Sequence, residues 1–229
     1  MRTPVEQGGA MSGDDPATTA EREDDEPGEG AVEPAGVGRL LAFSDGVFSI
    51  AFTILVLDIA VPDDLTPAGL RAAVAGQVPQ LLSAVLSFAV IGRFWISHHD
   101  MLRRVRGADG GLLVVNIALL AAVALIPFTT SLLAEYGDLV EPTVYYAGMV
   151  AISAALQLLM LWWLTRRGLF LPGTPHSHIQ EAVGGLGGTV VAFVVSIPVA
   201  FLSTTAAQLC WLLAFVPVTS LLRRLRPAR

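Results

Sequence analysis

Several ionisable and amide side chains interrupt long apolar segments of this 229-residue chain. The set that could carry chemistry is Asp45, Asp58, Arg93, His98, His99, Asp100 and Asn116. A charged group at the centre of a bilayer costs at least about 2.5–3.5 kcal/mol, so such groups usually have a partner or a role. Carboxylates and imidazoles in these positions could relay protons, bind a cation or hydrogen-bond to one another.

The same residues give little indication of a metal site or a catalytic site. Adjacent side chains on a helix point about 100° apart, so His98 and His99 do not readily bind one ion together. Hydrogen bonding is the leading hypothesis for both, with pH sensing and metal binding as alternatives. Cys210 is the only cysteine and all 14 basic residues are arginine, which excludes an internal disulfide and a lysine-containing phosphate loop. We expect no metal site, no catalytic residue, no cofactor and no enzyme activity.

The composition indicates which elements carry these residues. Hydrophobic residues make up 53% of the chain, charged residues only 15%, and the mean hydropathy is +0.62. Water-soluble domains average about 25% charged residues. Runs of about 20 apolar residues are long enough to cross a bilayer as helices. The sequence therefore predicts an all-α membrane protein with six transmembrane helices, over 40–61, 72–98, 110–134, 143–165, 183–203 and 205–222.

Charge is distributed unevenly along the chain. Ten acids and two arginines lie in residues 1–33, so residues 1–37 are predicted to be a disordered acidic tail and 38–229 the six-helix transmembrane domain. Arg39 precedes the first predicted helix, and arginines cluster after the second, fourth and sixth. Because positive residues stay cytoplasmic, both termini are predicted to be cytoplasmic in a multi-pass protein of the cell membrane. His176 and His178 are expected in a solvated loop on that side.

Asp45, the histidine pair and Asn116 are expected at a similar cytoplasmic depth in the first three helices. A shared polar network would let each group satisfy another. The alternative is that each side chain reaches the interface separately, but Asp, Asn and His are too short to reach far. Arg39 lies about 120° around the helix from Asp45. Asp45 is therefore expected to pair with His98, Asn116 or another subunit.

One face of the first predicted helix carries large aliphatic side chains. Ile50, Ile54 and Leu57 recur at i, i+4 and i+7, which places them on one side of a helix. Thr53 flanks this face, and Ser49 lies about 100° away from Ile50. Taken alone, ordinary helix packing explains such a stripe.

Three separated motifs resemble a known family. The string from Arg39 to Asp45, RLLAFSD, resembles the RxxxFSD signature of helix 1 in the lysosomal and bacterial potassium channels. The segment 94–99, FWISHH, resembles the FWxxHH pattern of that family. Asn116 and the string Ile126-Pro127-Phe128 resemble its third helix. The resemblance covers about residues 39–165, and the remainder is similar only in helix count.

The resemblance implies a bacterial homotetramer in which helix 1 of each subunit lines a central pore without a TVGYG filter. Ile50 would form the main constriction, with Ile54 and Leu57 as further apolar rings. Ser49 and Thr53 would be pore hydroxyls, and the transported ion would be K⁺, with Na⁺ as a second candidate. A supporting polar network near the cytoplasmic end is implied for Arg39, Phe43, Ser44, Asp45, Trp95, His98 and Asn116.

Some roles stay open at this point. Asp58 would place carboxylates at the outer mouth, where they concentrate cations, or would be an interfacial acid without a role. The competing hypothesis for the whole chain is a proton-coupled secondary transporter that uses Asp45 and His98 or His99. A membrane scaffold whose acidic tail binds a basic partner is a third. The expected partners are further copies of the chain and the lipid bilayer, with no nucleic acid.

Overall fold

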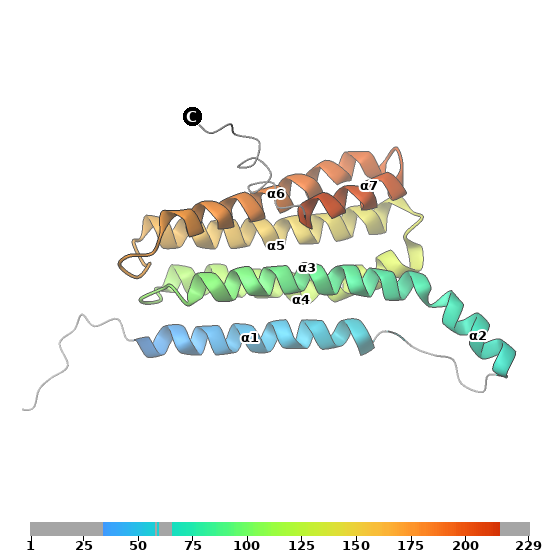
Figure 1. The fold of residues 1–229 in the computed structure, drawn as a ribbon, viewed down its shortest axis with the longest axis horizontal. Coiled ribbons are helices and arrows are strands. Elements are labelled where there is room, and N and C mark those ends of the chain that lie inside the picture. The colour runs from blue at the N-terminus through green and yellow to red at the C-terminus, as the bar shows by residue number, and fades with distance from the viewer. Residues whose placement is uncertain (1–33, 58, 60–65, 216–229) are drawn as a thin grey trace, which may run out of the picture. The chain divides into compact units, whose positions relative to one another are not determined.

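The computed structural model describes residues 34–57, 59 and 66–215. These residues form mainly α-helices (Figure 1). In the described part of the chain no β-strand occurs, only an isolated bridge between Val105 and Phe170. The helices are α1 (Pro34–Leu57), α2 (Pro67–Gly76), α3 (Val78–Leu102), α4 (Gly110–Tyr136), α5 (Val140–Arg166), α6 (His176–Ala200), α7 (Thr204–Trp211) and the 3₁₀ helix η1 (Leu212–Phe215).

Within the described residues, five helical segments are long and apolar enough to cross a membrane. They are Gly36–Leu57, Gly69–Leu102, Gly110–Tyr136, Val140–Arg166 and His176–Ala200. The long helices lie side by side in Figure 1, which confirms the all-α membrane fold expected from the composition. The sixth predicted helix, 205–222, is represented by α7 and η1, and its last part, 216–222, lies outside the described residues.

The first helix begins earlier than predicted. Residues 34–37 belong to α1, so the predicted disordered tail is wrong for these four residues; the rest of that prediction lies outside the described residues. Val37 is buried in the bundle, and this tertiary contact extends the helix into a segment of low helix propensity. The predicted end near residue 61 falls where residues 58 and 60–65 lie outside the described residues.

The second predicted helix, 72–98, is in fact two helices. α2 begins after Thr66, whose hydroxyl accepts a hydrogen bond of 3.2 Å from the backbone N–H of Gly69. α3 follows after Gln77 and continues to Leu102. Pro79 lacks a backbone N–H, so it fits the first turn of a new helix and not the interior of a continuous one.

The α6 helix starts about two turns before the predicted residue 183. His176 and His178 therefore lie in its first turn, and their expected place in a loop is wrong. Pro175 precedes the helix with φ −66° and ψ 134°, and its fixed φ suits the entry to a helix. α4 and α5 agree with the prediction to within one turn.

The core lies where α4 and α5 meet the other helices. α1 packs against α3 and α4, and α5 packs against α4 on one side and α6 on the other. Three buried aromatic residues hold the short α7 in place. The ring centroids of Phe193 and Trp211 lie 5.5 Å apart, those of Tyr146 and Trp211 lie 4.9 Å apart, and the indole N–H of Trp211 donates to Ser196 Oγ over 2.8 Å.

Candidate functional site

One long face of α1 packs against α3 and α4. Phe48 is fully buried, and its ring centroid lies 5.5 Å from that of His98 on α3. Phe52, beside this face, lies 4.5 Å from Phe88 of α3 by ring centroids. This buried face fixes the position of α1 on the bundle. Its buried members recur at helical spacing and are Val37, Leu40, Ser44, Phe48, Ala51 and Leu55.

The opposite face of α1 is open in the single chain. Ile50, Ile54 and Leu57 are 60%, 42% and 80% exposed. Ser49 and Thr53 are also exposed, and their hydroxyls donate to the backbone carbonyls four and three residues earlier, over 2.7 and 2.9 Å. Because each hydroxyl proton is used within the helix, the hydroxyl oxygens can offer lone pairs to a cation.

Three fully buried polar side chains join α1, α3 and α4. The amide nitrogen of Asn116 donates to Ser44 Oγ over 3.0 Å, and the Ser44 hydroxyl donates to the Leu40 carbonyl over 2.8 Å. His98 Nε2 lies 2.7 Å from Asn116 Oδ1. Since the amide oxygen can only accept, Nε2 of His98 carries the proton. The structure thus brings Ser44, His98 and Asn116 together.

Asp45 belongs to a second group of contacts. Its carboxylate accepts a hydrogen bond of 2.8 Å from the indole N–H of Trp95 and lies 3.7 Å from His99 Nδ1. Within the described chain Asp45 therefore contacts Trp95 and His99, and not His98 or Asn116 as expected; the third expected partner, another subunit, stays a prediction. Asp45 points about 100° around α1 from Ser44, so it meets the part of α3 that carries Trp95 and His99, one turn apart.

The remaining predicted residues lie outside these two groups. Arg39 and Phe43 are exposed on the same face of α1 as Ile50. The structure does not bring them into the polar contacts of the described chain. Asp58 lies outside the described residues. Within residues 34–57, 59 and 66–215, no three His, Cys, Asp or Glu side chains are arranged to hold a metal ion.

Two buried polar contacts were missed by the sequence analysis. The Gln157 amide on α5 donates to the Phe94 carbonyl of α3 over 2.9 Å. Ser87 hydrogen-bonds to Thr130 over 2.7 Å and to Tyr146 over 3.0 Å, joining α3, α4 and α5. Ser87 lies eleven residues before His98 on the same face of α3, and this spacing is the signal that could have indicated the contact.

Asp109 joins the start of α4 to the end of α5. Its Oδ1 accepts hydrogen bonds from the Leu112 backbone N–H over 2.8 Å and from the Trp163 indole over 3.0 Å, and Arg167 Nε donates to its Oδ2 over 3.2 Å. The Leu112 N–H is the largest influence, and together with Trp163 and Arg167 it lowers the pKa of the Asp109 carboxyl below its ordinary value.

Membrane-spanning helices that bury polar side chains between them are typical of channels and transporters. A family model described as the endosomal/lysosomal potassium channel TMEM175 matches residues 39–127, from α1 to Pro127 in α4. A Streptomyces collinus protein named a potassium channel is 43% identical over 162 residues, which cover 66% of this chain and 78% of that protein. The chain belongs to the TMEM175 family, which confirms the resemblance seen in its motifs.

A structure and a distant relative extend this comparison. The crystal structure of a lysosomal potassium-selective channel TMEM175 homolog from Chamaesiphon minutus aligns with a TM-score of 0.66 and 29% identity, over 80% of this chain and 97% of that chain. The human endosomal/lysosomal proton channel TMEM175 is 32% identical over 145 residues, covering 58% of this chain and 28% of the human protein. The family is one of ion channels and not an enzyme class.

Proposed function

We propose that the chain is a potassium-permeable cation channel of the cell membrane, formed by four copies arranged around the open face of α1. The observation that carries the proposal is the stripe of exposed aliphatic side chains at Ile50, Ile54 and Leu57, opposite a face that packs on α3 and α4. The names of the Streptomyces and Chamaesiphon relatives, a potassium channel and a potassium-selective channel, support the choice of ion.

The gate of this channel is a set of apolar rings. Four copies of α1 would form one ring from each of the three aliphatic residues, with Ile50 at the narrowest point. An apolar constriction stops ions by excluding water and not by binding the ion. The sequence contains no TVGYG filter, so any preference for K⁺ over Na⁺ would come from oxygens such as those of Ser49 and Thr53.

The polar groups behind α1 hold the pore helix in position. Ser44, His98 and Asn116 fix its buried side, and Asp45 with Trp95 fixes the neighbouring side. Arg39 and Phe43, which face the same way as Ile50, would complete this network across the central axis. Asp58 would add a ring of carboxylates at the outer mouth and concentrate cations there.

The orientation follows from the arginines. The arginines that flank α3, α4 and α5 at one end of the bundle support a cytoplasmic location for this end and for both termini. The acidic segment 1–33 would then extend into the cytoplasm.

A flux measurement in liposomes tests this function. With imposed gradients of K⁺ or Na⁺, channel activity gives a flux that grows with the driving force and needs no coupled ion. Cross-linking in lipid should end at four subunits. A fixed stoichiometry with protons would instead support the proton-coupled transporter, in which Asp45 and His98 or His99 would carry the proton. A cross-linked dimer as the largest species would contradict the tetramer.

A further inference from the structure

A cavity lies between α3, α4 and α7, at the end of the bundle opposite the arginines that follow α3 and α5. Its volume is about 490 Å³, which falls within the range of about 300–1,000 Å³ usual for sites that bind small organic molecules. Its walls come from the first part of α3, the end of α4 and α7, and no residue of α1 lines it. The cavity is therefore separate from the proposed pore face.

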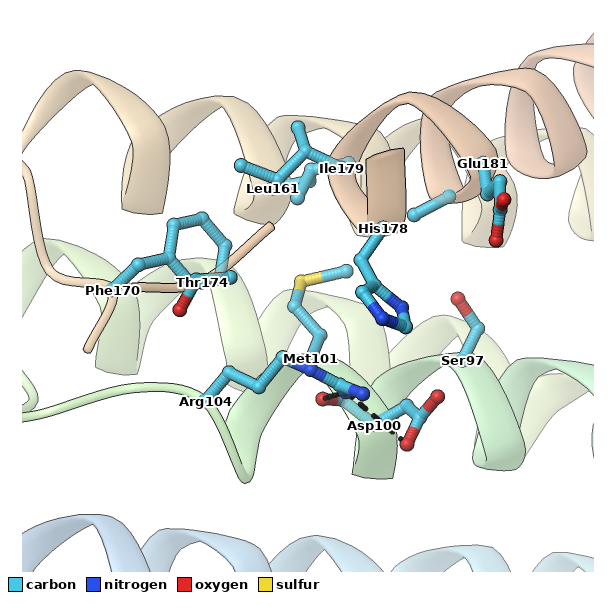
Figure 2. A pocket seen from close by; sticks show the side chains of 11 residues that line it. Ser97, Asp100, Met101, Arg104, Leu161, Phe170, Thr174, His178, Ile179 and Glu181 are labelled. Atoms are coloured by element: carbon cyan, nitrogen blue, oxygen red, sulfur yellow. Dashed lines mark hydrogen bonds and ion pairs between the residues drawn. The ribbon is translucent and has the colours of Figure 1, made fainter. Parts of the chain in front are cut away.

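The acidic side chains of this cavity have no basic partner in the described chain. At the other end of the bundle, a groove between α3 and α6 holds Asp100, but that carboxylate is paired with Arg104 over 3.2 Å (Figure 2). Glu135 and Asp138 line the larger cavity and form no ion pair with any described residue, and no arginine is among the residues that line it. The Tyr136 hydroxyl donates a hydrogen bond to Glu135, which leaves the negative charge in place.

Helix ends do not reverse this negative charge. The starts of α3 and α7 border the cavity, and a helix N-terminus carries about half a positive charge. The end of α4 borders it as well, and a helix C-terminus carries about half a negative charge. Two full carboxylates outweigh these partial charges, so the cavity attracts cations.

Part of the cavity wall is apolar. Leu82 and Leu86 of α3, Leu133 of α4 and the fully buried Trp211 of α7 contribute to it. An inorganic ion gains nothing from such a wall, and within residues 34–57, 59 and 66–215 no three His, Cys, Asp or Glu side chains are placed to hold a metal ion. An organic cation with an apolar body fits both the charge and the wall.

Polar groups of α7 supply further hydrogen-bond acceptors. Thr204 and Thr205 bring hydroxyl oxygens to the cavity. The amide nitrogen of Gln208, one turn further along α7, donates to the Gly137 carbonyl over 3.2 Å. This hydrogen bond ties α7 to the end of α4, so the hydroxyls and the two carboxylates surround one space. A primary ammonium group has three N–H donors, which this set of oxygens can accept.

We propose that this cavity binds a small organic cation that joins a primary ammonium group to an apolar body. The ammonium group donates charge-assisted hydrogen bonds to Glu135 and Asp138. The apolar body packs against the leucines of α3 and α4 and is removed from water there. A neutral ligand of the same shape gains only the second contact, and an anionic ligand is repelled.

A ligand-observed NMR titration of the purified full-length chain in detergent tests the proposal without measuring ion flux, with empty micelles as the background. The probes are 2-phenylethylamine, 2-phenylethanol and phenylacetate, which share an aromatic body and differ in charge. The amine should bind about tenfold more tightly than the alcohol, and phenylacetate should bind most weakly. Equal binding of the three probes would show that the cavity does not recognise charge, and would overturn the proposal.

Matched variants of the acidic side chains assign the preference to this cavity. Glu135→Gln combined with Asp138→Asn should remove the preference for the amine over the alcohol. Glu141→Gln is the control, because Glu141 lies in the first turn of α5 at the same end of the bundle and does not line the cavity. An unchanged preference in the double variant, or an equal loss in the control, would overturn the proposal.

A second pair of variants separates this cavity from the proposed pore. Thr205→Phe narrows the cavity and should weaken amine binding about tenfold, whereas Ala206→Phe changes the next residue of α7, which does not line the cavity, and should leave binding unchanged. Both side chains are exposed, so neither variant should unfold the chain. Ile50→Asn should also leave amine binding unchanged. Loss of binding in Ile50→Asn but not in Thr205→Phe would place the amine in the pore and overturn the proposal.

Discussion

The two long faces of α1 have opposite surroundings although both are mainly apolar. The face with Phe48, Ala51 and Leu55 is buried against the bundle, and the face with Ile50 and Leu57 is open. Hydrophobicity does not separate them, because a membrane helix meets lipid, protein or a dry pore with similar side chains. Hydrogen-bonding groups make the difference. The buried face holds Ser44 in reach of Asn116, whereas the hydroxyls near the open face bond only to their own helix.

The sharpest test of this contrast compares truncations on the two faces. Phe48→Ala should lower the free energy of unfolding by about 3–5 kcal/mol, because it leaves a cavity in a fully buried site. Ile50→Ala removes a side chain that is 60% exposed in its own subunit and would meet only its copies across the central axis. Its cost should therefore be smaller, about 1 kcal/mol or less. Denaturant or thermal unfolding of the purified proteins measures both. Equal destabilisation by the two variants would break the distinction between the faces.

The second test replaces one apolar side chain on each face of α1 with asparagine. Ile50→Asn should wet the proposed constriction and raise the flux per folded tetramer. A barrier lowered by about 1.4 kcal/mol corresponds to about a tenfold increase. Phe52→Asn should instead reduce the yield of folded protein, because Phe52 packs against Phe88. Liposome flux normalised to folded tetramer compares them.

The outcomes of this second test are distinct. A flux raised by Phe52→Asn and left unchanged by Ile50→Asn would mean that the other face lines the pathway. Unchanged flux in both variants would remove α1 from the pore wall, and the proposed channel architecture with it.

Much of this arrangement could be predicted from the sequence. Helical periodicity in residues 50–57 separates the aliphatic face, and polar residues at one depth indicate where the first spans meet. The sequence does not determine which of these polar side chains hydrogen-bond to each other. His98 and His99 lie at almost the same depth but about 100° apart on α3, and only the rotation of α3 against α1 assigns Asn116 to the first and Asp45 to the second.

Some helix ends could also not be predicted from the sequence. The segment 67–102 stays apolar through the break at Gln77, so hydropathy indicates one span where the chain forms two helices. The start of α6 is polar, and its glycine-rich continuation has low helix propensity. Packing of α6 against α5 makes this segment helical nonetheless. Gln157 was missed because a single amide in an apolar run gives no periodic signal.

A smaller effect is expected at Asp45, which lies between the two faces. Asp45→Ala leaves the Trp95 indole N–H without its acceptor, which should cost about 1 kcal/mol, near the lower end of the usual range because the site is partly exposed. Assembly should weaken accordingly. Asp45→Asn keeps an oxygen acceptor and should recover most of the loss. Tetramer stability measured by cross-linking during a denaturant titration checks this, and full stability of the alanine variant would exclude a supporting role.

The smallest effect is expected from removing the charge of Asp109 by Asp109→Asn, at a residue that supports the buried face of α1 indirectly through α4. Asp109→Ala removes the cap of α4 and should cost about 1 kcal/mol. Asp109→Asn keeps a side-chain oxygen that can cap α4. At neutral pH it should therefore lose only the part of the unfolding free energy that depends on the carboxylate charge. Because the folded pKa of Asp109 is lowered, its charged form stabilises the fold above the ordinary carboxyl pKa. This stability is lost as the pH falls through the folded value.

The difference in unfolding free energy between the native chain and Asp109→Asn should therefore shrink as the pH falls from about 7 to about 3. Flux per folded tetramer should be the same for both, because Asp109 contacts α4 and α5 and not the open face of α1. A gap in stability that stays constant with pH would show that the carboxylate charge contributes nothing. A change in flux per folded tetramer would show that loss of the Asp109 charge at the start of α4 alters the open face of α1. The buried and open faces of α1 would then not act independently.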